Sequence, residues 1–246
     1  MMETRVSKER IRTLFETIGA HGRRENGGCE RLAFSPAERA ARSALADAAA
    51  HLGFHVFRDA VGSVFALRPG TDPEAEAVYT GSHLDTVPDG GCFDGASGVL
   101  CGLAALELLE TEQVSTRRPI VLVSWANEEG ARFAPAMMGS GVFTGAIPFE
   151  TAAASTDADG VTVSEELARE EGIPRGNANA QAQPGNAETA ADEPGVTFNA
   201  ETAAGGPGVL DNAAATAAAA ASALATAGPT APPRGLPRPA AYLELH

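Results

Sequence analysis

The chain of 246 residues has little of several things that most globular proteins use freely. Aromatic residues make up 5% of it, and much of its 44% hydrophobic content is alanine, so the core that it can bury is smaller than that percentage suggests. Lys8 is its only lysine, a pattern of salt-adapted proteins and also of proteins from GC-rich genes. It has no run of about 18 apolar residues and no apolar secretory segment at its N-terminus. These absences predict a soluble, cytoplasmic protein of one or two domains.

Cysteine and positive charge are also scarce. Cys29, Cys92 and Cys101 are an odd set without Cys-x-x-Cys spacing, which argues against a disulfide framework and against a zinc site made of thiolates. The 18 basic residues are outweighed by 32 acidic ones, and the net charge of −14 would repel nucleic acid and anionic membranes. The composition therefore predicts neither of these as a partner.

The first 150 residues alternate between helix and strand patterns. Apolar residues recur at helical spacing in residues 6–20, and Ser35 with Glu38 predicts a capping box for a helix that runs to about residue 51. Another helix is expected over 95–110. Strands are predicted at 54–57, 63–67, 77–82 and 119–125. Because strand, helix and strand follow one another around 95–110, we expect an α/β fold with a mostly parallel central sheet flanked by helices.

Beyond residue 150 the composition changes abruptly. Residues 176–239 are largely Ala, Gly, Pro, Asn and Thr. Such a stretch buries too little apolar area to offset chain entropy, so we predict a disordered, low-complexity insert. An alternating pattern returns at 241–246 and predicts one more strand. The predicted parts of the chain are a domain formed by 1–175 and 240–246, and the insert 176–239.

Polar residues that suit a divalent metal follow two of the predicted strands. His83 and Asp85 alternate at the end of one strand, so their side chains share a face on which Asp85 can accept a hydrogen bond from the imidazole. Asp94 follows a glycine-rich loop, and Glu128 and Glu129 follow the next strand. Ligands of parallel sheets collect beyond the carboxyl ends of the strands, so we expect these oxygen and nitrogen donors to converge.

Each part of this pattern also has a simpler interpretation. His83 and Asp85 fit a solvated strand end, and Asp94 fits a helix N-cap that satisfies backbone donors. Glu128 and Glu129 fit an ordinary acidic loop. However, two neighbouring carboxylates with no Lys or Arg beside them in the sequence are costly unless a cation neutralises them. Adjacent residues at a strand end point in different directions, so one glutamate can bind metal while the other faces the substrate.

Longer motifs carry a resemblance to a known family. They are Gly81-Ser-His-Leu-Asp, Gly90-Gly-Cys-Phe-Asp-Gly, Asn127-Glu-Glu-Gly-Ala-Arg-Phe and the closing Tyr242-Leu-Glu-Leu-His. In these motifs the chain resembles the dinuclear-metal peptidase and amidohydrolase superfamily. Within it, the chain is most similar to the branch of N-carbamoyl-L-amino-acid hydrolases, allantoate amidohydrolases and β-ureidopropionases. The likeness covers residues 1 to about 175 and 240–246.

The resemblance implies a zinc-exopeptidase-like catalytic domain that binds two divalent ions, which can be Zn, Mn, Co or Ni. It implies that the metal ligands are His83, Asp94, Glu129 and His246. Glu128 would be the general base, and Asp85 would orient His83. The implied reaction is hydrolysis of a linear ureido or amidine C–N bond in a small molecule by a metal-activated water. The alternative within the superfamily is an aminoacylase or exopeptidase.

The chain also departs from the family pattern. The family's last metal ligand, a histidine, has no counterpart, and the smaller domain that mediates homodimerisation is absent. The low-complexity region is foreign to the pattern. Because the sequence stops at His246 within a motif, we expect an incomplete site that binds about one ion weakly. A non-catalytic, truncated fragment is therefore a further hypothesis.

Overall fold

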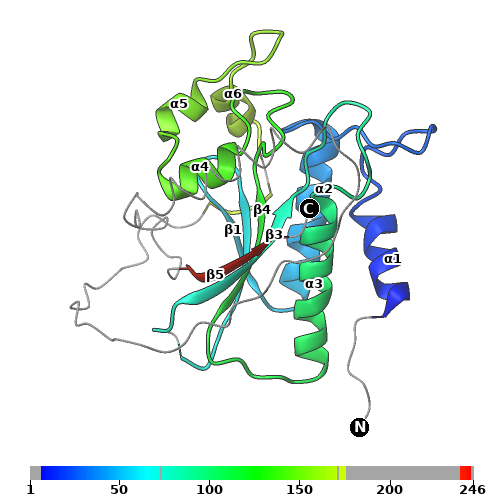
Figure 1. Cartoon of the computed structure of the whole chain (residues 1–246), viewed down its shortest axis with the longest axis vertical. Coiled ribbons are helices and arrows are strands. Elements are labelled where there is room, and N and C mark those ends of the chain that lie inside the picture. Colours follow the sequence, from blue (N-terminus) through cyan, green and yellow to red (C-terminus); the bar gives the residue numbers. More distant parts are fainter. Residues whose placement is uncertain (1–6, 73, 171, 176–238, 245–246) are drawn as a thin grey trace, which may run out of the picture. The chain divides into compact units, whose positions relative to one another are not determined.

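The computed structural model describes residues 7–72, 74–170, 172–175 and, for the backbone, 239–244. They contain a five-stranded sheet with the strand order β1-β2-β4-β3-β5 (Figure 1). The strands are β1 (His55–Arg58), β2 (Val64–Arg68), β3 (Ala77–His83), β4 (Ile120–Trp125) and β5 (Pro239–Glu244). The prediction of a disordered insert at 176–239 lies, except for Pro239, outside the described residues, and so does the prediction for His246.

The sheet is mixed, so the expectation of a mostly parallel sheet was wrong in that respect. β3 runs parallel to β4 and to β5, whereas β1 with β2 and β2 with β4 are antiparallel. The short connection 59–63 forces β1 and β2 into a hairpin, while β3 and β4 are joined through helix α3 (Ala96–Thr111), as parallel neighbours require. The α/β class with flanking helices is confirmed.

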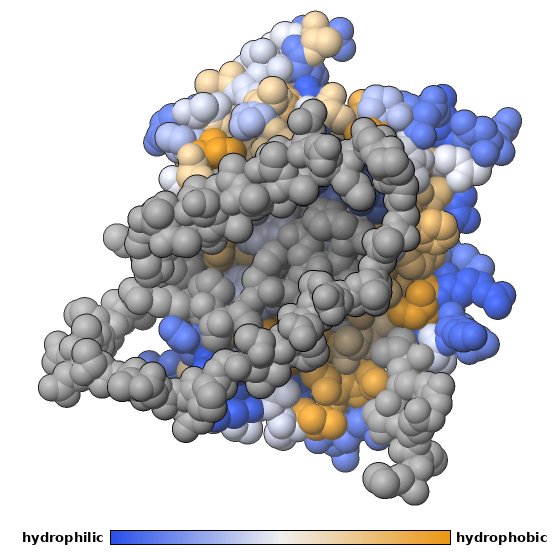
Figure 2. All heavy atoms as spheres, in the orientation of Figure 1, coloured by the Kyte–Doolittle hydropathy of each residue, from blue (hydrophilic) through white to orange (hydrophobic). Residues whose placement is uncertain are grey.

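Helices α1 (Lys8–Thr17) and α2 (Pro36–His51) precede the sheet in the chain. The Ser35 side chain accepts a hydrogen bond from the Glu38 N–H (3.2 Å), as the sequence predicts. The Glu38 carboxylate, however, accepts from the N–H of Phe34 (3.1 Å), one residue before the N-cap, which is a variation on the expected capping box. Figure 2 shows hydrophilic side chains along the outer side of α1, the side opposite its buried Leu14.

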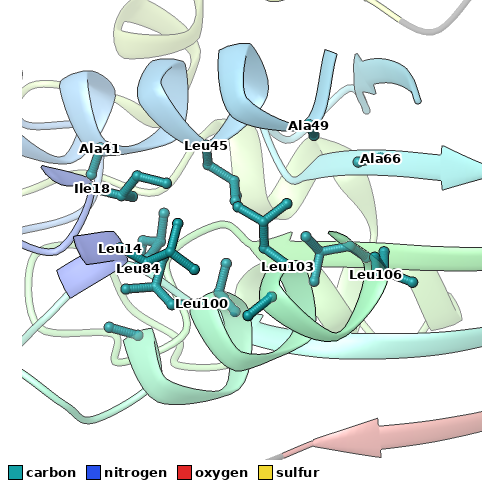
Figure 3. Close-up of a cluster of buried hydrophobic side chains, with 14 of the residues drawn as sticks. Leu14, Ile18, Ala41, Leu45, Ala49, Ala66, Leu84, Leu100, Leu103 and Leu106 are labelled. Carbon is teal, nitrogen blue, oxygen red and sulfur yellow. The ribbon is translucent and has the colours of Figure 1, made fainter. Parts of the chain in front are cut away.

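The largest hydrophobic cluster joins α1, α2 and α3 to one face of the sheet (Figure 3). Leu45 of α2 and Leu103 of α3 point toward one another, and Leu103 is fully buried. Each buried leucine of this kind stabilises the fold by about 1.5–3 kcal/mol. The cluster fixes α3 against β3 and β4, and α3 begins directly after the loop that carries Asp94.

Three shorter helices follow β4: α4 (Met138–Thr144), α5 (Phe149–Ala153) and α6 (Val163–Ala168). Phe143 of α4 packs on the other face of the sheet, with its ring centroid 5.2 Å from that of Trp125 and 5.9 Å from that of Phe65. In the part of the chain that the structure describes, no helix combines the length and hydrophobicity that a membrane span needs.

Candidate metal centre

β3 and β4 end side by side, and the candidate site lies beyond their carboxyl ends. His83 is the last residue of β3 and pairs in parallel register with Trp125, the last residue of β4. The chain then leaves β3 through residues 84–95 and β4 through residues 126–130. Both segments carry the polar residues singled out in the sequence, and their convergence at this edge is as expected.

His83 is 1% exposed and has a defined orientation. Its Nδ1 atom lies 2.9 Å from the main-chain carbonyl oxygen of Asp85. Because a carbonyl can only accept, Nδ1 is the donor in this contact, and Nε2 is the nitrogen that faces the acidic residues. Nε2 lies 3.5 Å from Oε2 of Glu128 and 4.0 Å from Oδ1 of Asp94. The ring therefore presents its metal-binding nitrogen to the acidic residues.

Asp85 contacts the His83 ring through its main-chain carbonyl rather than through its carboxylate. Its Oδ1 atom is 3.7 Å from Nδ1 of His83. The carboxylate instead accepts hydrogen bonds from the backbone N–H groups of Glu128 (3.1 Å) and Glu129 (3.2 Å). Burial raises the pKa of Asp85 to about 6, although these two donors oppose the rise. The expected carboxylate–imidazole bond was therefore wrong, because the carboxylate is used to hold the backbone after β4.

His83, Asp94 and Glu129 each offer a ligand atom, and these atoms lie within 4.8 Å of one another. Burial raises the pKa of Glu129, the neighbouring Asp94 carboxylate raises it further through a hydrogen bond and its charge, and His83 opposes the rise. Two carboxylates at hydrogen-bonding distance repel each other when both are ionised, and a divalent cation between them removes that repulsion. One imidazole nitrogen and two carboxylates are a donor set that fits such a cation.

Gly95 allows the Asp94 loop to lie against the His83 ring. Its φ angle is +60°, and a Cβ atom there would be 2.4 Å from Cε1 and 2.5 Å from Nε2 of His83. No side chain larger than hydrogen fits this position. Gly95 is also the N-cap of α3, so the simpler interpretation of Asp94 as that helix's N-cap was wrong.

Asn127 is a structural residue of the site whose role the sequence did not reveal. It is 1% exposed and has a φ angle of +49°, a conformation that asparagine tolerates better than most residues. Its Nδ2 donates to the carbonyl oxygens of Phe133 (2.8 Å) and Pro135 (3.2 Å). The carbonyl of Glu128 accepts from the N–H of Met137 (2.6 Å). The turn that carries both glutamates is thus held by hydrogen bonds to residues 133–137 as well as by the Asp85 carboxylate.

Arg31 supports the other half of the site, a role that the sequence did not reveal. The side chain is fully buried. Its Nε donates to the carbonyl of Leu84, between His83 and Asp85. Its main chain exchanges two hydrogen bonds of 2.9 Å with Thr86, one to the hydroxyl and one from the N–H. Arg31 thereby fixes the chain directly after β3.

The chain is similar to known proteins in sequence and in fold. Residues 79–242 match the profile of peptidase family M20/M25/M40. The chain is 41% identical over 165 residues to the N-carbamoyl-L-amino-acid amidohydrolase of Rhizobium meliloti, a match that covers 67% of this chain and 40% of the relative. It is 34% identical over 156 residues to the allantoate amidohydrolase of Bacillus subtilis (strain 168), with 63% and 38% covered.

Solved structures of hydantoinase/carbamoylase family amidases are also similar to this chain. A hydantoinase/carbamoylase family amidase from Burkholderia ambifaria matches with a TM-score of 0.65 and 43% identity, over 71% of this chain and 44% of that chain. One from Burkholderia vietnamiensis matches with a TM-score of 0.66 and 42% identity, over 69% and 41%. The chain thus spans less than half the length of the relatives that it matches.

Proposed function

Because the chain belongs to peptidase family M20/M25/M40, we propose that its reaction is the metal-dependent hydrolysis of linear ureido or amidine C–N bonds. The observation that carries this proposal is the convergence of His83, Asp94 and Glu129, whose ligand atoms lie within 4.8 Å of one another. The substrate class is supported by relatives that are N-carbamoyl-L-amino-acid and allantoate amidohydrolases. A small molecule of either kind is the expected substrate.

The site's metal would be held by His83 through Nε2 and by the carboxylates of Asp94 and Glu129. We propose His246 as a further ligand and expect a complete site to take two divalent ions, of Zn, Mn, Co or Ni. The resemblance to the family implies His246, which lies outside the residues that the structure describes. When bound, such ions polarise a carbonyl group and lower the pKa of water.

Glu128 is proposed as the general base. Its Oε2 atom lies 3.5 Å from Nε2 of His83, so its carboxylate lies beside a proposed metal ligand. There it would take a proton from the attacking water and deliver it to the leaving nitrogen. Asp85 holds the backbone N–H of Glu128 at 3.1 Å and so fixes the position from which this carboxylate acts.

The test is direct hydrolysis by this chain, loaded with Mn²⁺ or Zn²⁺. We expect release of the free amino acid from an N-carbamoyl-L-amino acid, or of ammonia from allantoate, to exceed release from the matching N-acetyl amino acid. Removal of metal with a chelator and the His83→Ala substitution should each abolish it. Faster hydrolysis of the N-acetyl compound would identify an aminoacylase instead. Cytoplasmic localisation remains a prediction.

A further inference from the structure

Two of the three cysteines lie together next to the loop that carries Asp94. Cys29 is fully buried and Cys92 is 8% exposed. The Cys92 thiol donates to the carbonyl of Gly27 at 3.3 Å, and Cys92 lies close enough to Cys29 to raise the pKa of the Cys29 thiol. The N–H of Cys29 donates to the carbonyl of Gly90 at 2.9 Å, within an isolated antiparallel bridge. These bonds hold the segment that carries Cys29 against the loop that carries Cys92.

A buried positive charge accompanies this pair. Nη1 of Arg31 lies 3.2 Å from Sγ of Cys29 and donates to the carbonyl of His21 at 2.8 Å. Nη2 of Arg31 is buried and has no hydrogen-bond partner among the described residues. Burial raises the pKa of Cys29, and the charge of Arg31 opposes this rise. A guanidinium next to a thiol favours its thiolate, which is the reactive form in disulfide exchange.

We propose that Cys29 and Cys92 are a redox-active thiol pair that closes reversibly to a disulfide. This modification site is separate from the hydrolysis proposed above and does not depend on it. The two backbone segments are already bonded to each other, so rotation of the two side chains can bring the sulfur atoms toward the ~2.05 Å of a bond without separating the segments. The pair comes from positions 63 residues apart in sequence, so no spacing motif announces it.

The chemistry requires a small-molecule disulfide as the oxidant. Cys92 reacts first, because it is the more exposed of the two, at 8% against 0% for Cys29. Its thiolate attacks one sulfur of the oxidant and expels one thiol, which leaves a mixed disulfide. Cys29 then attacks the Cys92 sulfur and expels the second thiol. The two protein protons end on the two released thiols, and the oxidant gains two electrons.

The disulfide would join the turn at 23–29 to the loop at 87–94. Cys92 is two residues before Asp94, so the bond would restrict the segment that positions this metal ligand. We expect the backbone amides of residues 87–95 to exchange with deuterium more slowly in the oxidised protein than in the reduced one. Oxidation of the thiol pair would therefore lower the mobility of the loop that carries Asp94 in the candidate metal centre.

The experiment incubates the whole chain with oxidised glutathione and counts free thiols after denaturation. The three thiols of the reduced chain should fall to one, return with dithiothreitol, and leave a cross-linked peptide pair containing Cys29 and Cys92. Cys101→Ser is the matched control, because Cys101 lies on α3 and its substitution should leave the cross-link unchanged. Cys29→Ser and Cys92→Ser should each prevent it.

Either of two results would overturn the proposal. One is a wild-type chain that keeps three thiols under oxidant. The other is a cross-linked peptide that contains Cys101. Peptide mapping of the wild-type chain decides the question even if Cys29→Ser fails to fold. Unchanged deuterium exchange at 87–95 in the cross-linked protein would overturn the connection to the metal centre.

Discussion

Oδ1 of Asp85 accepts a hydrogen bond of 3.1 Å from the backbone N–H of Glu128, a residue 43 positions farther along the chain. A side chain that follows β3 thus fixes the backbone that follows β4. The second oxygen of Asp85 does the same for Glu129. Since the two glutamates are the proposed base and a proposed metal ligand, the geometry of the centre depends on one buried carboxylate.

The first prediction is that Asp85→Asn lowers affinity for Mn²⁺ or Zn²⁺ by about 10–100-fold, as the loss of a supporting hydrogen bond to a metal site commonly does. Asparagine keeps one acceptor but turns an NH₂ group toward the other backbone donor. Calorimetric titration measures the effect. Asp89→Asn is the control, because the Asp89 side chain is 64% exposed. Equal affinity in both variants would show that the Asp85 bonds do not support the site.

Gly95→Ala should disrupt the centre. The added Cβ would lie 2.4 Å from the His83 ring, and the φ angle of +60° is unfavourable for alanine. We expect a loss of about 1–3 kcal/mol in unfolding free energy together with loss of metal binding. Gly91→Ala is the matched control, since a Cβ at Gly91 meets nothing within 4 Å. Denaturant unfolding and calorimetry of both variants check this, and full metal affinity in Gly95→Ala would contradict it.

The two adjacent glutamates should separate in their effects. Glu128→Gln should leave metal affinity almost unchanged and lower turnover of an N-carbamoyl amino acid by about 10²–10⁴-fold, because it removes a general base and keeps the side chain's size. Glu129→Gln should weaken metal binding itself. Parallel calorimetry and rate measurements distinguish them. Reversed phenotypes would mean that the roles of the two residues have been exchanged.

Stability should fall as pH rises from about 4 to about 7. Burial raises the pKa of Asp59 to about 7, while the N–H groups of Ser63 and Val61 oppose the rise. A folded pKa above the ordinary ~3.9 means that the folded state holds the proton more tightly. The protonated Asp59 carboxyl therefore contributes its full stabilisation, up to about 4 kcal/mol of unfolding free energy, below about pH 4. This contribution is lost as pH rises through about 7.

Asp59→Asn removes this titration, so its unfolding free energy should decrease less between pH 4 and pH 8 than that of the wild type. Some decrease should remain, because burial also raises the pKa of Glu38 to about 7. Urea unfolding at both pH values is the measurement. The exposed Asp47→Asn serves as the control and should match the wild type. A pH dependence that Asp59→Asn leaves unaltered would remove Asp59 as its source.

Glu170→Ala should destabilise the fold by about 3–5 kcal/mol, the usual effect of removing one partner from buried ion pairs. The Glu170 carboxylate contacts Nη2 of Arg42 and lies 3.2 Å from Nη1 of Arg58, and all three side chains are at most 6% exposed. The substitution leaves both guanidinium groups buried with less compensation. Glu16→Ala, on the exposed side of α1, should have little effect. Equal unfolding free energies for the two variants would contradict the prediction.

Local patterns predicted the elements well. The strands expected at 77–82 and 119–125 occur at Ala77–His83 and Ile120–Trp125, because continuous apolar runs and turn residues are readable from sequence alone. The pairing of β2 with β4 was not predictable in this way. It depends on which edges meet after the hairpin β1–β2 forms, and that choice is made by tertiary packing rather than by neighbours in the chain.

The residues of the candidate site were likewise predicted only in part. The convergence of His83, Asp94 and Glu129 followed from their positions at strand ends and loops, and the structure brings them together. The contributions of Arg31 and Asn127 did not follow, because both act through main-chain carbonyls that any residue possesses. The sequence thus identifies side chains that can bind metal, but it does not identify side chains whose role is to hold the backbone in place.

The position of β3 between β4 and β5 has a consequence for how the protein is made. β4 is synthesised soon after β3. Glu244 of β5, which pairs with Gly81 of β3, comes about 160 residues after Gly81. Synthesis of that stretch takes ~10–30 s at ~5–20 residues per second. Until then one side of β3 presents unpaired N–H and C=O groups, which can pair with another nascent chain. We expect the newly made protein to depend on protection of this edge, a requirement that arises from strand order and not from composition.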